Sequence, residues 1–300
     1  MRSVNLFYYG SGDFVREIGK KGTQSDITLY GRKTDDCIFT ILHPSMFPEK
    51  LSSLTDSIAP VDAAVLQVES IDRSLGEVIM ALDLFGITNG IIYSNEENRE
   101  KLRQIISGTN LKNYSFAEGG GGDVIAKAER FQHRTRGKGV TVLIDHFFTV
   151  RSVGTVALGF VLSGKVEKHQ ELHASYLKKE VQVKSIQVQD EDVPEADTGT
   201  RVGLALKNID TEELERGMIL SSEELETEKS LTGTISPHPA VRNRMPESGE
   251  IFLASTMRYQ RGTMSGNRLD LDSPIYMLGN EGVICSNTAT PRILGSFRMP

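Results

Sequence analysis

Apolar positions in the first 138 residues form short runs separated by stretches with helical spacing. Residues 4–9, 37–42, 63–68 and 90–93 are short apolar runs, as expected for buried strands. Between them, residues 13–21, 47–57 and 74–85 have the spacing of helices, and the first of these places Phe14, Val15 and Ile18 on one side. Such alternation predicts a parallel sheet with helices on both faces.

Four consecutive glycines, at 119–122, precede the last helix expected in this region. Asp123 follows them as a candidate N-cap, and Val124 and Ile125 begin the apolar side of the helix. The helix runs into a basic patch that ends at Lys138, with Gly137 and Gly139 around it. The pattern therefore predicts a first domain over residues 1–138.

From residue 140 onward the pattern changes to short strands with turns every ten or so residues, which is typical of small barrels. Apolar residues fall on odd positions up to Val183 and on even positions from Ile186. This change of phase in one strand predicts a bulge near Ser185. An acidic, serine-rich stretch at 221–228 is followed by strand-like segments at 229–236, 250–260, 273–278 and 290–298. The predicted barrels are residues 139–222 and 223–300.

Composition and cysteine content indicate a folded globular protein. Aromatic residues make up 7% and charged residues 25%, as expected for a folded globular chain. Cys37 and Cys285 are far apart and neither belongs to a metal-binding motif, so we expect no metal site and a reducing, cytoplasmic location. We expect no membrane segment, because no apolar stretch approaches about 18 residues.

The net charge is −6, but residues 229–300 alone carry eight basic and five acidic side chains. That segment can therefore present a local phosphate-binding surface.

Two stretches resemble the second domain of translation elongation factors of the EF-Tu and SelB type. They are residues 153–164, VGTVALGFVLSG, and residues 202–220, VGLALKNIDTEELERGMIL. Residues 61–70 and 81–95 resemble the scaffold of the same family's GTPase domain. The resemblance implies a P-loop-GTPase-like α/β domain followed by two small all-β barrels, the EF-Tu architecture. The chain is most similar to archaeal SelB-like factors, including the EF-Pyl type of methanogens, for which a role with pyrrolysine has been suggested.

The phosphate-binding motif of that family is not intact. GxxxxGKS/T uses backbone N–H groups, one Lys and a Mg²⁺-binding hydroxyl to share phosphate charge. When Gly19 and Lys20 are aligned with its GK pair, Phe14 stands at the first glycine and Lys21 at the hydroxyl position.

The other nucleotide motifs are also altered. His43 and Pro44 stand in the DxxG region, and the segment before residue 37 is too short for a switch loop. The guanine motif NKxD is reduced to Asn95 followed by two glutamates and Asn98, so the guanine-binding carboxylate is missing. We therefore expect no catalytic residue and no GTP or Mg²⁺ cofactor; a residual nucleotide site on Gly10, Gly12 and Asn95 is the alternative.

The resemblance also implies an aminoacyl-tRNA site. In the family, a groove on the second domain takes the aminoacylated CCA end, which implies that Asp145 and Phe148 help to form the pocket, with His146 beside them. The alternatives are a surface strand for Asp145 and His146 and a core role for Phe148. Arg216 corresponds to the arginine that meets the tRNA 5′ phosphate, with a salt bridge at a helix end as its alternative.

Further arginines are candidates for the tRNA backbone, and scattered surface charges are the alternative for each one. They could follow the acceptor and T stems by phosphate and shape. They are Arg201, Arg242, Arg244, Arg258, Arg261 and Arg268.

Three functions are open at this stage. The first is a factor that binds aminoacylated tRNA without a GTP switch and has no DNA or membrane partner. The second is a divergent GTP-binding elongation factor whose atypical loop uses Lys20 or Lys21. The third is a scaffold for the ribosome or another translation factor. The sequence does not name the tRNA or the amino acid.

Overall fold

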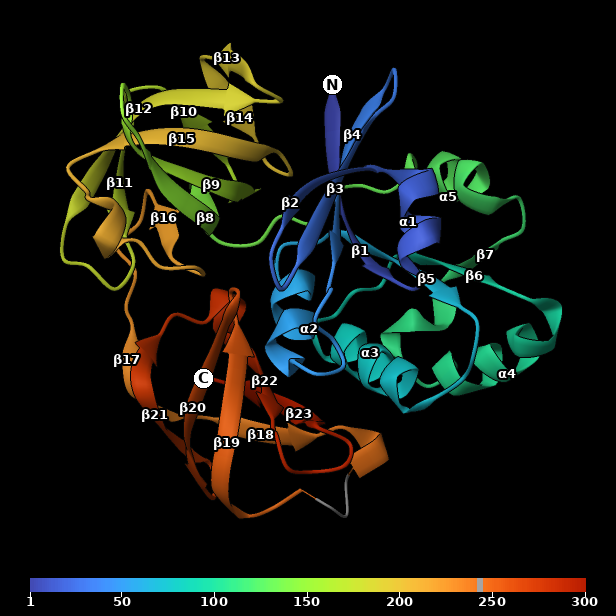
Figure 1. Ribbon diagram of the computed structural model, residues 1–300. Coiled ribbons are helices and arrows are strands. Elements are labelled where there is room, and N and C mark those ends of the chain that lie inside the picture. Colours follow the sequence, from blue (N-terminus) through green and yellow to red (C-terminus); the bar gives the residue numbers. More distant parts are fainter. Residues whose placement is uncertain (242–244) are drawn as a thin grey trace.

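The computed structural model describes residues 1–241 and 245–300, which form one α/β domain and two all-β domains (Figure 1). The first domain has a seven-stranded sheet in the order β2-β3-β4-β1-β5-β6-β7. Neighbours from β4 to β7 are parallel, whereas β2 and β3 add an antiparallel extension beside β4. The strands are β1 (Arg2–Tyr9), β2 (Lys20–Gln24), β3 (Thr28–Lys33), β4 (Cys37–His43), β5 (Ala63–Val68), β6 (Gly90–Ser94) and β7 (Ser115–Ala117).

Helices cover both faces of this sheet, as the apolar pattern predicts. Helices α1 and α5 pack on one face, where Ile18 and Val124 share a cluster with Val65. Helices α2, α3 and α4 pack on the other face, where Leu54 and Val78 join the main core. Their bounds are α1 (Gly12–Ile18), α2 (Leu51–Ile58), α3 (Arg73–Leu84), α4 (Glu96–Ile106) and α5 (Gly120–Ala128). None of the described helices is long and apolar enough to cross a membrane.

Two helix predictions are wrong in detail. The first helix ends at Ile18 because Gly19 has an extended backbone and Lys20 begins β2. Asp123 does not cap α5, since the helix already begins at Gly120. Its carboxylate instead accepts a 2.9 Å hydrogen bond from the N–H of Glu118, on the segment before the helix.

The second domain is a closed barrel in the order β11-β16-β8-β9-β15-β12, because β11 also pairs with β12. The predicted bulge is confirmed, with a register shift between Val183 and Ser185. The strands are β8 (Thr141–Val150), β9 (Gly154–Ser163), β11 (Glu171–Ala174), β12 (Glu180–Val188), β15 (Arg201–Lys207) and β16 (Ile219–Ser221), with the short β10 (Lys165–Glu167), β13 (Glu191–Val193) and β14 (Glu195–Asp197) beside them.

The third domain is an antiparallel sheet in the order β17-β21-β20-β19-β22-β23-β18. Only Gly233 separates β17 from β18, so the two edges of the sheet come together. The strands are β17 (Glu228–Thr232), β18 (Thr234–Pro237), β19 (Ser248–Ser255), β20 (Arg258–Ser265), β21 (Arg268–Ile275), β22 (Glu281–Cys285) and β23 (Ile293–Arg298).

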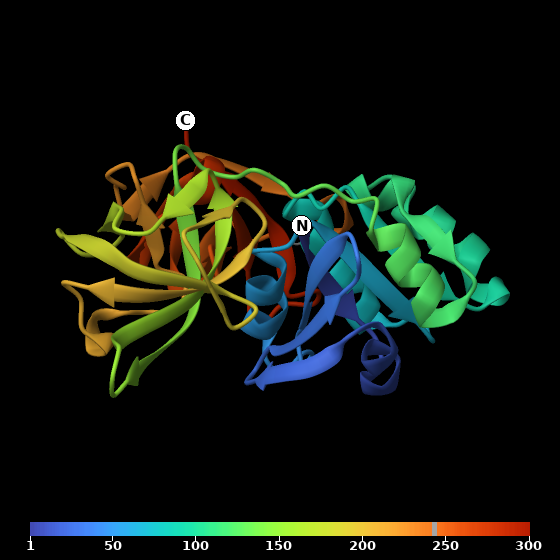
Figure 2. The same ribbon diagram turned by 90° about the horizontal axis from the view of Figure 1, so that it is seen from above.

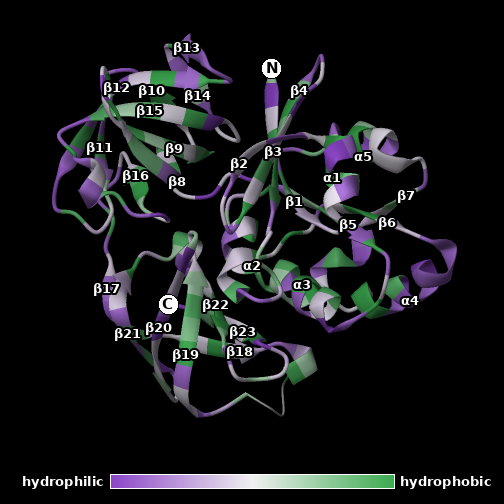
Figure 3. Cartoon of the chain, viewed as in Figure 1, coloured by the Kyte–Doolittle hydropathy of each residue, from purple (hydrophilic) through white to green (hydrophobic). Residues whose placement is uncertain are grey.

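The strand predictions for the third domain are partly wrong. The segment predicted at 250–260 is a hairpin, because the chain reverses at Thr256 and Met257, which both have positive φ. A non-glycine pair at such a turn gives no sequence signal. Apolar residues concentrate along the central strands of the domains, while α4 has a mostly hydrophilic surface (Figure 3).

Candidate functional site

The turn after β1, where a GTPase holds phosphate, is closed by side chains. The Tyr8 hydroxyl donates to the Ser11 carbonyl at 2.8 Å, and the Ser11 N–H donates to Gln67 Oε1 at 2.6 Å. Gly10 has a φ of +147°, and a Cβ built on it would lie 2.4 Å from Gln67 Oε1. The space directly over Gly10 is therefore occupied by protein rather than open to a phosphate.

Aromatic rings fill the neighbouring strand ends. Phe14 of α1 stacks on Tyr93 of β6 with ring centroids 4.7 Å apart. Tyr8 meets His43 edge-on at 5.3 Å, at the end of β4. Phe14 is mostly buried and packs in the core beneath α1, which explains why a large apolar residue stands where the phosphate motif needs a glycine.

Asn95, at the position of the guanine-binding motif, caps a helix. Its side chain caps α4 by accepting from the Asn98 N–H at 3.0 Å, and the Asn98 amide donates to the Glu69 carbonyl at 3.1 Å. The adjoining hollow is lined by Glu69, Glu97 and Lys101, and Lys101 already pairs with Glu97 at 3.5 Å. Gly12 begins α1 and has open space around it.

The two lysines proposed for an atypical phosphate loop lie elsewhere. Lys20 and Lys21 are on β2, at the outer end of the sheet, and both are exposed. Lys21 Nζ donates to Gln24 on the same strand at 2.6 Å. The segment between α1 and β4 is thus an antiparallel β2–β3 pair in place of a switch loop.

In the barrel, Asp145, His146 and Arg201 come together at a bulge in β8. The Asp145 carboxylate is buried and contacts Arg201 Nη2 at 3.0 Å and His146 Nδ1 at 3.2 Å. The strand register shifts between Ile144 and His146, which places the extra residue Asp145 in the bulge. Burial raises the pKa of Asp145, but Arg201 and His146 outweigh it and hold the pKa below the ordinary value.

Of these three residues, Arg201 borders a cleft between the first two domains. The cleft has a volume of about 310 Å³ and lies between the β2–β3 pair and the barrel strands β9, β12 and β15. Arg201 lines it directly, as does Leu158, which pairs with His146 across β8 and β9. Phe148, two residues beyond His146, is 44% exposed, so the core alternative for this side chain is wrong.

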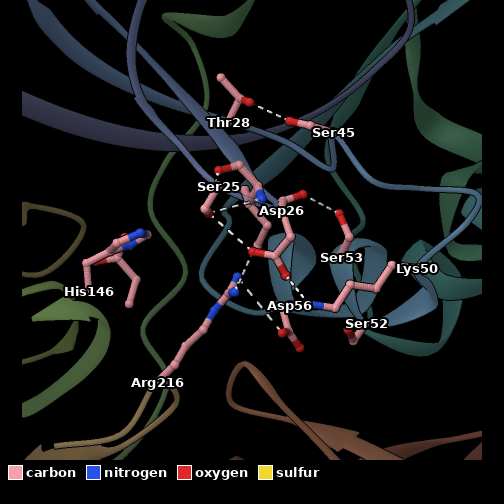
Figure 4. Close-up of polar contacts among 12 residues, drawn as sticks. Ser25, Asp26, Thr28, Ser45, Lys50, Ser52, Ser53, Asp56, His146 and Arg216 are labelled. Carbon is pink, nitrogen blue, oxygen red and sulfur yellow. Dashed lines mark hydrogen bonds and ion pairs between the residues drawn. The ribbon is translucent and has the colours of Figure 1, made fainter.

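Arg216 lies in an ion cluster between the first domain and the barrel. Its Nη1 is 2.8 Å from Asp26 Oδ1 and its Nη2 is 3.9 Å from Asp56 Oδ2. Lys50 Nζ contacts the other oxygen of Asp26 at 2.7 Å, on the opposite side from Arg216 (Figure 4). His146 lies on the barrel side of the same view.

The pKa values of the two aspartates in this cluster are shifted in opposite directions. Burial raises the pKa of Asp56 to about 7, and Arg216 offsets this only in part. Burial also acts on Asp26, but hydrogen bonds from Lys50 and Arg216 lower its pKa to about 2. Arg216 therefore already has an anionic partner before any phosphate approaches, in a salt bridge between domains rather than at a helix end.

The arginines of the third domain differ in their surroundings. Arg258 pairs with Glu215 of the barrel, stacks over Tyr176 with its Cζ 4.0 Å from the ring centroid, and its side chain is only 10% exposed. Arg261 pairs with Glu250 on the surface and its side chain is 62% exposed. Arg268 is also exposed, beside Asp270. Arg242 and Arg244 lie outside the described residues.

Polar contacts also join the first and third domains, and these were not predicted from the sequence. Arg292 donates to Glu77 from Nε at 3.1 Å and from its backbone N–H at 3.0 Å. His238 Nε2 lies 3.1 Å from Asp83 Oδ2. These pairings have no local sequence signal, because their members are separated by more than 150 residues. In the described part of the chain, no group of three or more His, Cys, Asp or Glu side chains is placed to hold a metal ion.

Comparisons with known proteins agree on one family. The family model "Elongation factor Tu domain 2" matches residues 154–221. A Methanocaldococcus jannaschii protein described as uncharacterized is 36% identical over 98% of this chain and 97% of its own length. The selenocysteine-specific elongation factor of the same organism is 31% identical over 71% of this chain, and the match spans half of that factor.

Solved structures have the same fold. The chain superposes on translation elongation factor SelB from Methanococcus maripaludis, in complex with a GTP analogue, with a TM-score of 0.84 and 21% identity. The match covers 100% of this chain and 79% of that one. The apo form of the same factor gives a TM-score of 0.80.

Proposed function

Because this chain belongs to the SelB-like family of translation elongation factor homologues, we propose that it binds the acceptor end of an aminoacylated tRNA without a GTP switch. The barrel takes the aminoacyl end, with Asp145, His146, Phe148 and Arg201 around it. The first domain serves as a fixed partner of the barrel and uses no nucleotide.

One observation carries this proposal, namely the Asp145–Arg201 pair beside the inter-domain cleft. Burying a carboxylate is costly unless it is paired, and Arg201 supplies that pairing from the wall of the cleft. Asp145 Oδ1 has no hydrogen-bond partner among the described residues. The carboxylate is buried and does not line the cleft, so Arg201 is the member of this pair that an aminoacyl ester in the cleft contacts.

Support for the individual arginines differs. Arg261 and Arg268 are exposed and can meet phosphates if they leave weak surface pairs, which contribute about 0–1 kcal/mol. Arg216 and Arg258 are engaged between domains, so a phosphate contact from either requires rearrangement of the interface. For both residues the structure thus favours a salt bridge between domains, which differs from the helix-end pair considered for Arg216 and from the scattered surface charge considered for Arg258.

Loss of the GTP switch is supported by the closed turn at Gly10 and by fixed contacts between domains. A switch needs two states that a nucleotide binds with different affinity. Here the region after α1 is an antiparallel strand pair, and ion pairs join the first domain to each of the other two domains. We infer that the tRNA-binding surface is assembled without a nucleotide.

The aminoacyl site is tested by replacing Phe148, whose exposure makes the substitution harmless to the core. Phe148→Ala should weaken aminoacylated tRNA binding about 10-fold, since an aromatic stacking contact contributes about 1–3 kcal/mol. Binding of the same tRNA without its amino acid should change less, because the aminoacyl pocket is then only partly filled. Filter binding at fixed salt measures both.

Ile105→Ala is the matched control, because Ile105 is also 44% exposed but lies on α4 of the first domain. It should leave both affinities unchanged. Equal losses for charged and uncharged tRNA in Phe148→Ala would remove this residue from the amino-acid pocket.

Absence of nucleotide binding is tested with a fluorescent GTP analogue. We expect no saturable binding up to about 100 μM with or without Mg²⁺, because an intact site needs a phosphate loop and a Mg²⁺-binding hydroxyl. Micromolar, Mg²⁺-dependent binding would instead establish the divergent GTP-binding factor.

A scaffold for the ribosome or another translation factor is the second candidate. Two exposed isoleucines, Ile71 and Ile105, line the same hollow beside α4, and apolar side chains gathered on a surface favour protein contact. The scaffold function is favoured over tRNA binding if no tRNA associates at low salt while a translation component copurifies. Substitution of Ile71 or Ile105 should then abolish the copurification.

A further inference from the structure

A second cavity lies where all three domains meet. Its volume is about 330 Å³, within the range of small-molecule sites. The end of α3, the barrel and the third domain each contribute apolar walls, and the linker from α5 to β8 crosses the junction (Figure 2). The wall includes one carboxylate, Glu281, which pairs with Arg298. Its apolar and cationic residues include Leu84, Leu143, Leu162, Val283 and the two linker arginines Arg134 and Arg136.

The two arginines are held in place by helix ends. Arg136 Nη1 donates to the carbonyl of Ala59, the C-cap of α2. Arg134 Nη2 donates to the carbonyl of Phe85, the C-cap of α3, at 3.2 Å. Cations are favoured at helix C-termini, so these contacts fix both guanidinium groups at the wall of the cavity.

Those contacts leave most of the hydrogen-bonding capacity unused. A guanidinium has five N–H donors, and Arg134 Nη1 and Arg136 Nε are buried without a partner among the described residues. Neither arginine forms an ion pair in that part of the chain. The carboxylate of Asp62 acts on both from a distance, but it already accepts the backbone N–H groups of Asn5 and Arg134 at 2.8 Å each.

Burial of these cations is consequently compensated only in part, by the charge of Asp62. Desolvation lowers the pKa of Arg134, and it lowers the pKa of Arg136 to about 10, with the neighbouring Arg134 adding to the effect. A buried charge without a carboxylate beside it is unfavourable. An anion in the cavity would relieve this cost at both residues.

We propose that this cavity binds a small organic anion, with its carboxylate, sulfonate or phosphate group on Arg134 and Arg136. The apolar body of the ligand lies against Leu84, Leu143, Leu162 and Val283, which come from all three domains. This site is separate from the tRNA site proposed above, and its ligand acts as an effector.

The position of the site gives the ligand a defined effect. A compound that contacts all three domains binds their assembled arrangement and has less to contact once they separate. By mass action it stabilises that arrangement by RT ln(1 + L/Kd), where L is the free ligand concentration. Any affinity that depends on domain arrangement is then coupled to the effector.

The test uses the full chain and the fluorescent sulfonate 1-anilinonaphthalene-8-sulfonate. We expect saturable binding with one molecule per chain. Phenyl phosphate should compete and benzyl alcohol should not, because only the former has an anionic group.

Three variants locate the bound probe. Thr135→Trp places a large side chain at an exposed position of the cavity wall without changing an arginine, and it should weaken probe binding at least about 10-fold. Arg136→Gln should also weaken it about 10-fold, as expected for loss of a charge-assisted contact. Arg130→Gln, at an exposed position of the same linker, is the control and should bind as the native chain does.

The neutral probe N-phenyl-1-naphthylamine separates charge from shape, since Thr135→Trp should exclude it while Arg136→Gln should not. If Arg136→Gln does not fold, Thr135→Trp and the competition experiment decide. Each of three results would overturn the proposal. The native chain would show no saturable binding, or Thr135→Trp would bind the probe with native affinity. The third result is that benzyl alcohol competes as well as phenyl phosphate.

Discussion

Replacing Glu77 with alanine is expected to lower the free energy of unfolding by about 3–5 kcal/mol, the cost of removing one partner of a buried ion pair. Glu77 is 1% exposed and receives both the side chain and the backbone N–H of Arg292. Burial raises its pKa, but the hydrogen bonds and charge of Arg292 outweigh burial and lower it. Without Glu77, the Arg292 cation stays at the interface unpaired, so the first and third domains should separate more readily.

Urea unfolding followed by circular dichroism measures the loss, and small-angle scattering measures the accompanying increase in size. Glu250→Ala is the matched control, because its pair with Arg261 is exposed and should contribute only about 0–1 kcal/mol. A Glu77→Ala protein as stable as this control would show that other contacts hold the two domains together.

The two aspartates around Arg216 should respond to amide substitution with opposite signs. Asp56 has a folded pKa of about 7, above its ordinary 3.8, so its ionised form is disfavoured in the folded chain. The wild type therefore loses stability as pH rises from about 4 to 7, because the folded state retains a proton that the unfolded state has released. At about 1.4 kcal/mol per pKa unit, Asp56→Asn should be more stable than wild type by about 2–4 kcal/mol at pH 8 and nearly equal at pH 4.

Asp26 behaves in the usual way for a paired carboxylate. Its folded pKa of about 2 lies below the ordinary 3.8, so its contribution is complete above pH 4 and is lost as pH falls toward 2. Asp26→Asn should therefore destabilise the protein by about 2 kcal/mol at pH 8. Thermal unfolding of both variants from pH 4 to 8 provides the measurement, and a shift of the same sign at pH 8 would contradict this account of the cluster.

Much of the first two domains could be predicted because their signals are local. The strand at 63–68 is β5 to the residue, since all six residues are buried and Gln67 is the only polar one among them. The bulge near Ser185 follows from a change of parity alone. By contrast, the helix predicted at 13–21 includes the first two residues of β2, because the exposed residues of this strand carry no periodicity and only pairing with β3 makes it a strand.

In the candidate site, too, some residues could be predicted from the sequence and others could not. Family resemblance led to Asp145, His146 and Phe148, and the structure places the first two together with Arg201, which lies 56 residues away from Asp145 in the sequence. The family resemblance gave no indication that Arg216 would face Asp26, because that pair depends on how two separately folded domains pack. Nor did it indicate the cavity at Arg134 and Arg136, which were noted only as part of a basic patch.

The outermost strands of the first sheet explain how this domain avoids self-association. Strand β2 leaves a row of unpaired backbone groups in solvent, and such a row can recruit another copy of the chain. Lys20 and Lys21 oppose that pairing by charge, and the shift in register between Lys21 and Gln24 makes the strand a poor template. At the other end β7 has only three residues, which is too short to nucleate a fibril-like stack. Two lysines that resemble a phosphate-binding remnant thus oppose edge-to-edge pairing at this end of the sheet.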